Sequence, residues 1–97
     1  QFDFTQDAAH IHNWVRGMNP WPVAWFAQDG KHIKVLESRL AENPLGAAPG
    51  TVLALKPLTI AAANGAVALL TVTPEGGKPM AGTAWAAGRR LKAGDNL

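Results

Sequence analysis

Residues 23–37, Val-Ala-Trp-Phe-Ala-Gln-Asp-Gly-Lys-His-Ile-Lys-Val-Leu-Glu, form the stretch that decides the fold. After Asp29-Gly30 the apolar Ile33 and Val35 alternate with the polar His32 and Lys34, and Asp-Gly is typical of the two-residue turn that joins antiparallel strands. The stretch therefore predicts a β-hairpin with strands at 23–28 and 31–37. Its expected register sets Phe26 opposite Ile33 and Ala24 opposite Val35 on the core face, and Trp25 opposite Lys34 and Ala27 opposite His32 on the other face.

The residues before the hairpin predict an α-helix. Four apolar residues recur at helical spacing and share one face: Ile11, Trp14, Val15 and Met18. Thr5 or Asp7 can cap the start of this helix by accepting hydrogen bonds from its first free N–H groups. Asn19-Pro20 predicts the end of the helix, because proline disfavours the α conformation at the residue before it. Residues 20–22, Pro-Trp-Pro, predict a stiff elbow.

The residues after the hairpin predict three more strands. We expect a loop over 38–50, a strand over 51–55, and a second hairpin of 58–63 and 66–73 around an Asn64-Gly65 turn. A turn-rich loop follows at 74–79. One or two helical turns at 81–87 then end at Gly88 as a glycine C-cap.

Together these elements predict a mainly β fold. The elements are one helix, five short strands and a terminal helical turn. The simplest way to close such a sheet is a small OB-like five-stranded antiparallel barrel, because closure removes exposed strand edges. We expect Arg16 to have a structural role in packing and hydrogen bonding. The large residues expected in the core are Trp14, Trp21, Phe26 and Val35.

Length and composition fit one domain over residues 1–97. Of the 97 residues, 47% are hydrophobic and 16% are charged, too few charges for a disordered chain. The absence of Cys excludes a disulfide scaffold, a thiolate zinc site and a Cys nucleophile.

The longest apolar stretch, 58–72, is interrupted by Asn64-Gly65 and is shorter than the roughly 20 residues of a membrane span, so we expect no membrane partner. The first residue is Gln, which favours a piece cut from a longer protein or a processed product.

Residues that could carry catalysis or bind a metal are few. His10 and His12 point about 200° apart on a helix and cannot share a metal ion, and His32 is the only other histidine. Ser38 has no G-x-S-x-G context. Residues 76–78, Gly-Gly-Lys, lack the length and the Ser/Thr ending of a phosphate-binding P-loop. The sequence therefore predicts no catalytic residue, no metal site and no cofactor site.

The basic residues are more informative by position than by number, since nine Lys and Arg against seven Asp and Glu give a net charge of only +2. Most lie on the first hairpin, in loops or at element ends, where a folded barrel can gather them on one side to neutralise phosphates. The candidate RNA-binding residues are Lys31, Lys34, Arg39, Lys78, Arg89 and Arg90. The alternative is a charged rim that only keeps a small domain in solution.

Residues 15–22, Val-Arg-Gly-Met-Asn-Pro-Trp-Pro, resemble the C-terminal domain of the methionyl-tRNA formyltransferase family, in which an arginine-bearing helix leads into Asn-Pro-Trp-Pro. Further blocks follow in the family's order over essentially the whole chain: Asp29-Gly30 with 33–35, 48–53, Asn64-Gly65 with Leu69-Leu70, and 74–80 through Arg89 to 94–97. Two places depart from the pattern. Ala62-Ala63 replace the usual Thr-Gly, and the terminal helix has Thr83, Ala84 and Trp85 where the family carries an acidic residue and leucines.

The resemblance implies a role for this chain within a larger enzyme. Enzymes of the family use 10-formyltetrahydrofolate to formylate methionine on initiator tRNA, in translation initiation, and their catalytic residues and folate site lie in an N-terminal domain. This chain would be the non-catalytic barrel that holds initiator methionyl-tRNA by its backbone, beside the N-terminal catalytic domain of the same polypeptide. We expect it to be a cytoplasmic monomer.

Two other interpretations stay open. Related formyltransferases that act on small molecules, and folate hydrolases, carry a similar C-terminal barrel, which implies the alternative of a structural domain with no RNA role. A free-standing single-strand binder is the third interpretation, and Trp25 is its one stacking platform.

Overall fold

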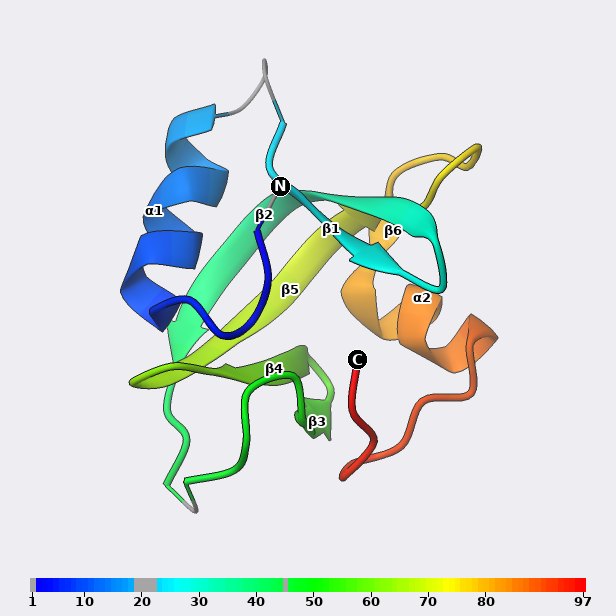
Figure 1. Ribbon diagram of the computed structural model, residues 1–97. Helices are drawn as coiled ribbons and strands as arrows, with labels where there is room; N and C mark the ends of the chain where they lie inside the picture. The colour runs from blue at the N-terminus through cyan, green and yellow to red at the C-terminus, as the bar shows by residue number, and fades with distance from the viewer. Residues whose placement is uncertain (1, 19–22, 45) are drawn as a thin grey trace.

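The computed structural model describes residues 2–18, 23–44 and 46–97 (Figure 1). Within these ranges the chain forms α1 (Ala8–Met18), β1 (Trp25–Gln28), β2 (Lys31–Ala41), β3 (Val52–Leu55), β4 (Leu58–Ala62), β5 (Gly65–Thr73), β6 (Met80–Ala81) and α2 (Gly82–Gly88). The strands pair antiparallel in the order β1-β2-β5-β4-β3, and β6 pairs with β5. The predicted mainly β class, with its N-terminal helix and short C-terminal helix, is confirmed. The described sheet has six strands where five were expected, because the two residues of β6 pair with Thr71 and Val72.

The first hairpin forms as predicted. Asp29 and Gly30 take left-handed φ values of 51° and 77°, as a two-residue turn of this type requires. The observed register sets Trp25 opposite Lys34, Phe26 opposite Ile33, Ala27 opposite His32 and Gln28 opposite Lys31. The pairing continues beyond β1, because the Val35 N–H donates to the Ala24 carbonyl at 2.9 Å.

Strand β2 is longer than predicted. Residues 38–41, expected in a loop, pair with residues 66–69 of β5. The register shifts between Val35 and Glu37 and again between Glu37 and Ser38. Such an irregularity breaks the alternation of apolar and polar residues, so the strand pattern in the sequence stops near 37 although the strand does not.

The second hairpin turns one residue earlier than predicted. Ala62 lies opposite Gly65, so the two-residue loop is Ala63-Asn64 and not Asn64-Gly65. The cause is a long-range contact: the Ala63 N–H donates to the Gln6 carbonyl at 3.1 Å, and the Ala63 carbonyl accepts the Ala8 N–H at 2.8 Å. The N-terminal segment therefore occupies the backbone groups that the predicted register would have used inside the hairpin.

Helix α1 begins where the sequence predicted, with Asp7 as its cap: the Asp7 Oδ1 accepts the Ala9 N–H at 2.9 Å. Its predicted apolar face packs on β2 and β5, with Ile11 and Val15 buried and Trp14 half-buried against the core. The side chain of Met18 and the predictions made for residues 19–22, including the helix stop, the elbow and a core position for Trp21, lie outside the described residues.

Helix α2 ends without the predicted glycine C-cap, because the helix continues through Gly88. The Leu91 N–H donates to the Ala86 carbonyl at 3.0 Å and the Arg90 N–H to the Ala87 carbonyl at 3.1 Å, the pair of bonds of a Schellman motif. Arg90 supplies the left-handed residue of this motif, with φ 57°.

The core lies inside the curled sheet and contains an aromatic cluster. Phe2, Phe4, Phe26 and Trp85 make edge-on or tilted contacts with ring centroids 5.1 to 6.0 Å apart. Phe26 and Val35 are buried, as predicted.

The two ends of the strand order are each covered by a chain end. The Phe2 N–H donates to the Trp25 carbonyl on β1 at 2.8 Å, and the Val52 N–H on β3 donates to the Asp95 carbonyl at 2.7 Å. In a fully hydrogen-bonded barrel, the outer edges of β1 and β3 would pair with each other. Here the two terminal segments form hydrogen bonds to these edges instead. In the described part of the chain, neither helix is long and apolar enough to span a membrane.

Candidate nucleic-acid interface

Two of the candidate cations lie on the first hairpin. Lys31 directly follows the Asp29-Gly30 turn, and Lys34 lies on β2 opposite Trp25 of β1 and Thr73 of β5. Both lysines are exposed. The hairpin therefore presents two cations near its turn, held in place by its buried face.

Helix α2 brings two further cations to the same turn. The Arg89 guanidinium forms an ion pair with the Asp29 carboxylate and lies 6.0 Å from the centre of the Trp85 ring. Trp85 is buried and contacts Phe26 edge-on at 6.0 Å, which fixes the helix against the hairpin. Arg90 directly follows Arg89, and Figure 1 shows the end of α2 beside the β1–β2 turn.

The loop 74–79 brings the fifth cation. Its Glu75 Oε1 accepts the His32 N–H at 3.1 Å, which attaches the loop to the hairpin. The loop carries an exposed Lys78 three residues after this contact. Asp29 and Glu75 are thus the two carboxylates whose contacts join these elements.

Five of the six candidates therefore lie on three elements that contact one another: Lys31, Lys34, Lys78, Arg89 and Arg90. Arg39 is set apart. It lies opposite Ala68 in the far half of β2, five residues and about 16 Å of strand from Lys34. We refer to the hairpin turn, loop 74–79 and the end of α2 together as the basic end of the molecule.

The basic end also holds an aromatic pair that the sequence analysis missed. The rings of Trp25 and His32 are stacked, with centroids 3.7 Å apart and planes 15° from parallel. The sequence placed Trp25 opposite Lys34 and His32 opposite Ala27, and both pairings are correct. The available signal was diagonal proximity, because aromatic side chains on one face of a hairpin reach the neighbour two residues along the partner strand.

Comparison with known proteins shows to which family this chain belongs. The model of the formyl transferase C-terminal domain matches residues 1–90. The chain belongs to this family. The chain is 39% identical over its full length to the methionyl-tRNA formyltransferase of Solibacter usitatus, 41% identical over 97% of its length to that of Heliobacterium modesticaldum, and 43% identical over its full length to that of Rhizobium rhizogenes. It spans 31% to 33% of the length of these three proteins.

The arginine that the family resemblance singled out has a local partner. In this formyl transferase C-terminal domain, Arg16 is exposed and its Nε donates to the Asn13 Oδ1 at 3.0 Å, one turn earlier on α1. Its expected packing against Trp21 lies outside the described residues.

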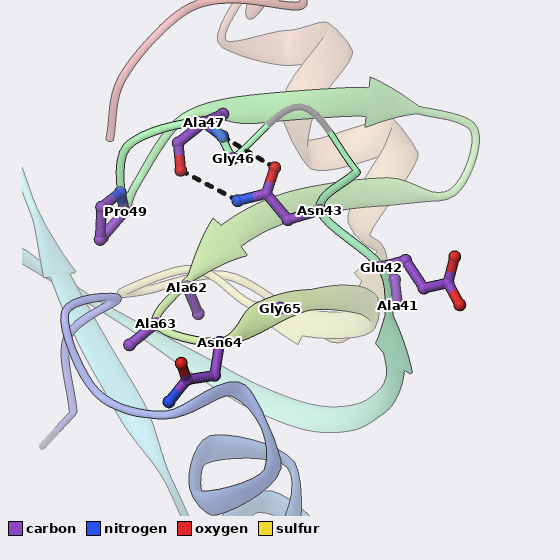
Figure 2. A pocket seen from close by; sticks show the side chains of 10 residues that line it. All are labelled: Ala41, Glu42, Asn43, Gly46, Ala47, Pro49, Ala62, Ala63, Asn64 and Gly65. Atoms are coloured by element: carbon purple, nitrogen blue, oxygen red, sulfur yellow. Dashed lines mark hydrogen bonds between the residues drawn. The ribbon is translucent and has the colours of Figure 1, made fainter.

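A cleft of about 470 Å³ lies away from the basic end, between residues 41–49 and the β4–β5 turn (Figure 2). The Asn43 side chain faces into its loop and is fully engaged there, donating to the Ala47 carbonyl and accepting the Ala47 N–H, both at 2.9 Å. Figure 2 shows the carboxylate of Glu42 pointing away from the Asn43 amide. The Asn64 amide donates outward to the Asp7 Oδ2 at 2.8 Å. The lining of small residues and engaged amides offers no acid–base pair.

One Ser–His contact exists elsewhere in the domain. The His12 Nδ1 lies 2.8 Å from the Ser38 Oγ, and this bond ties α1 to β2. No carboxylate among the described residues contacts His12, and none of the described clefts is lined by Ser38. The described part of the chain also contains no group of three His, Asp or Glu side chains placed to share a metal ion.

Proposed function

We propose that this domain is the tRNA-holding part of a methionyl-tRNA formyltransferase. In this proposal it binds initiator methionyl-tRNA through the ribose-phosphate backbone with Lys31, Lys34, Arg39, Lys78, Arg89 and Arg90. Formyl transfer from 10-formyltetrahydrofolate takes place in an N-terminal domain of the same polypeptide. The domain itself supplies no catalytic residue and no cofactor site, and it works as a monomer in the cytoplasm during translation initiation.

This proposal rests on one observation: three elements that bear cations contact one another at the basic end. Phosphate contacts from Lys and Arg position a nucleic acid without specifying its sequence, and structured RNA is bound largely by shape and backbone. Relatives that match the whole chain carry methionyl-tRNA in their names, which supplies the substrate class.

The test is a titration of the chain with initiator tRNA over a range of salt concentrations. Each neutralised phosphate steepens the salt dependence, so replacing Lys31, Lys34 and Lys78 by Ala is expected to lower the slope of log K against log salt by about three. Lys56→Ala is the matched control, because Lys56 is an exposed lysine in the β3–β4 turn. Affinity that does not change with salt would contradict the proposal.

For Arg89 alone, one observation favours a structural role over RNA binding. Arg89 is paired with Asp29 and packed near Trp85, so part of its charge is used inside the domain. If reversing Lys31, Lys34 and Lys78 to Glu in the full-length enzyme leaves aminoacyl-tRNA formylation unchanged, the barrel has a structural role instead of an RNA-binding one.

A further inference from the structure

The Trp25–His32 stack lies on the outer face of the hairpin and not in the hydrophobic core. Trp25 is half-buried, with its ring held on the outer face of the hairpin, while His32 is exposed. One face of the His32 ring is covered by Trp25, and among the described residues no other ring contacts it. The His32 side chain is exposed, so the pair is accessible to solvent on the His32 side.

The second His–Trp pair of the molecule has a different geometry. His10 and Trp14, on the outer side of α1, meet edge-on, with centroids 5.5 Å apart and planes at 72°. This pair presents no parallel ring surface. Among the described residues, the basic end is therefore where a histidine and a tryptophan stack in parallel.

The surroundings of the stack suit a nucleotide. Lys34 lies directly opposite Trp25 in the register, so its side chain is on the same face of the hairpin as the stack. Glu75 accepts the backbone N–H of His32 and not a proton of its ring, and no ion pair of the His32 imidazole is found among the described residues. A flat ring beside a cation is the combination with which proteins bind unpaired bases, because the base stacks and its phosphate is neutralised.

We propose that the Trp25–His32 pair is a stacking platform for one unpaired base of the bound RNA, with Lys34 on the adjoining phosphate. This inference rests on the proposed function, and it adds to it a site for a single-stranded nucleotide beside the backbone contacts. Because any base offers a flat π-face, the platform discriminates unpaired from paired nucleotides and not one base from another.

The experiment compares two RNAs: a duplex with a single-stranded 3′ end of adenosines, and the same duplex with blunt ends. His32→Ala is expected to weaken binding of the first RNA by at least about fivefold while leaving the second unchanged. His32→Phe, which keeps a flat ring, is expected to restore the affinity. His10→Ala is the matched control and is expected to change neither affinity.

The outcomes separate the two proposals. Salt-dependent binding of both RNAs with no selective loss in His32→Ala overturns the stacking platform and leaves the tRNA-holding role intact. Salt-independent binding of both RNAs by the unaltered chain overturns the proposed function itself. Should His32→Ala fail to fold, photo-crosslinking of the unaltered chain to the first RNA, with 5-iodouridine at an unpaired position, decides: crosslinks at His32 or Trp25 support the platform, and crosslinks only at other residues overturn it.

Discussion

At the scale of single residues, Arg90 adopts a backbone conformation that favours glycine. Its φ of 57° lies in the left-handed region, at the position where helices most often end in Gly. We expect Arg90→Gly to raise the free energy of unfolding by about 1 kcal/mol, measured by urea titration. The same change removes a candidate phosphate contact, so tRNA affinity is expected to fall while stability rises. Equal or lower stability of the variant would show that the Arg90 side chain makes a compensating contact.

Asp7 links the stability of the domain to pH. The amide of Asn64 and, after it, the Ala9 N–H hold the pKa of this carboxyl below its ordinary value of 3.8. A lowered folded-state pKa contributes stability above the unfolded value, and this contribution is lost as the pH falls through the folded value. We expect the chain to be more stable than Asp7→Ser, which retains a capping hydroxyl, at pH values above 3.8, and the two unfolding curves to converge at lower pH. A difference that stays constant down to pH 2 would contradict this.

At the scale of elements, the position of α2 depends on one glycine. A Cβ added to Gly82 would lie 1.9 Å from the Leu69 carbonyl oxygen, a backbone atom of β5 that cannot move aside cheaply. Gly82→Ala is therefore expected to lower the free energy of unfolding by about 3 kcal/mol and to detach α2 from the hairpin. Gly88→Ala is the matched control in the same helix, because nothing lies within 4 Å of its added Cβ, and we expect it to stabilise slightly. Thermal unfolding of both variants, followed by the near-ultraviolet signal of the tryptophans, measures the effect.

The elements that the sequence predicted well are those set by local chemistry. Asp29-Gly30 determines its own turn, and a two-residue turn at that position fixes the register of β1 and β2. The errors have distant causes: Gln6 and Ala8 take the backbone groups of Ala63 and shift the second turn. Pattern analysis within a short window cannot detect a partner more than fifty residues away.

At the scale of the whole molecule, the candidate cations could be predicted as a list but not as a surface. Residue type and loop position singled out Lys31, Lys78 and Arg89, yet their proximity depends on two contacts between distant segments, Arg89 with Asp29 and Glu75 with His32. Arg39 is on the same strand as Lys31, but it lies in the far half of that strand, away from both of these contacts, and is therefore apart from the basic end.

The closure of the whole molecule depends on the C-terminal segment, because it covers the free edge of β3. The Gly94 N–H donates to the Val52 carbonyl at 2.8 Å, the Val52 N–H to the Asp95 carbonyl at 2.7 Å, and the Leu97 N–H to the Gly50 carbonyl at 2.8 Å. Removing residues 94–97 is expected to lower the free energy of unfolding by about 3 kcal/mol, at roughly 1 kcal/mol for each lost hydrogen bond. Hydrogen exchange of the Val52 amide is expected to accelerate, while amides of α1 and the first hairpin keep their protection, because their partners lie elsewhere. Removal of Leu97 alone deletes one of the three hydrogen bonds and is expected to cost about 1 kcal/mol. Uniform loss of protection across the sheet would show that the segment stabilises the whole fold instead of one edge.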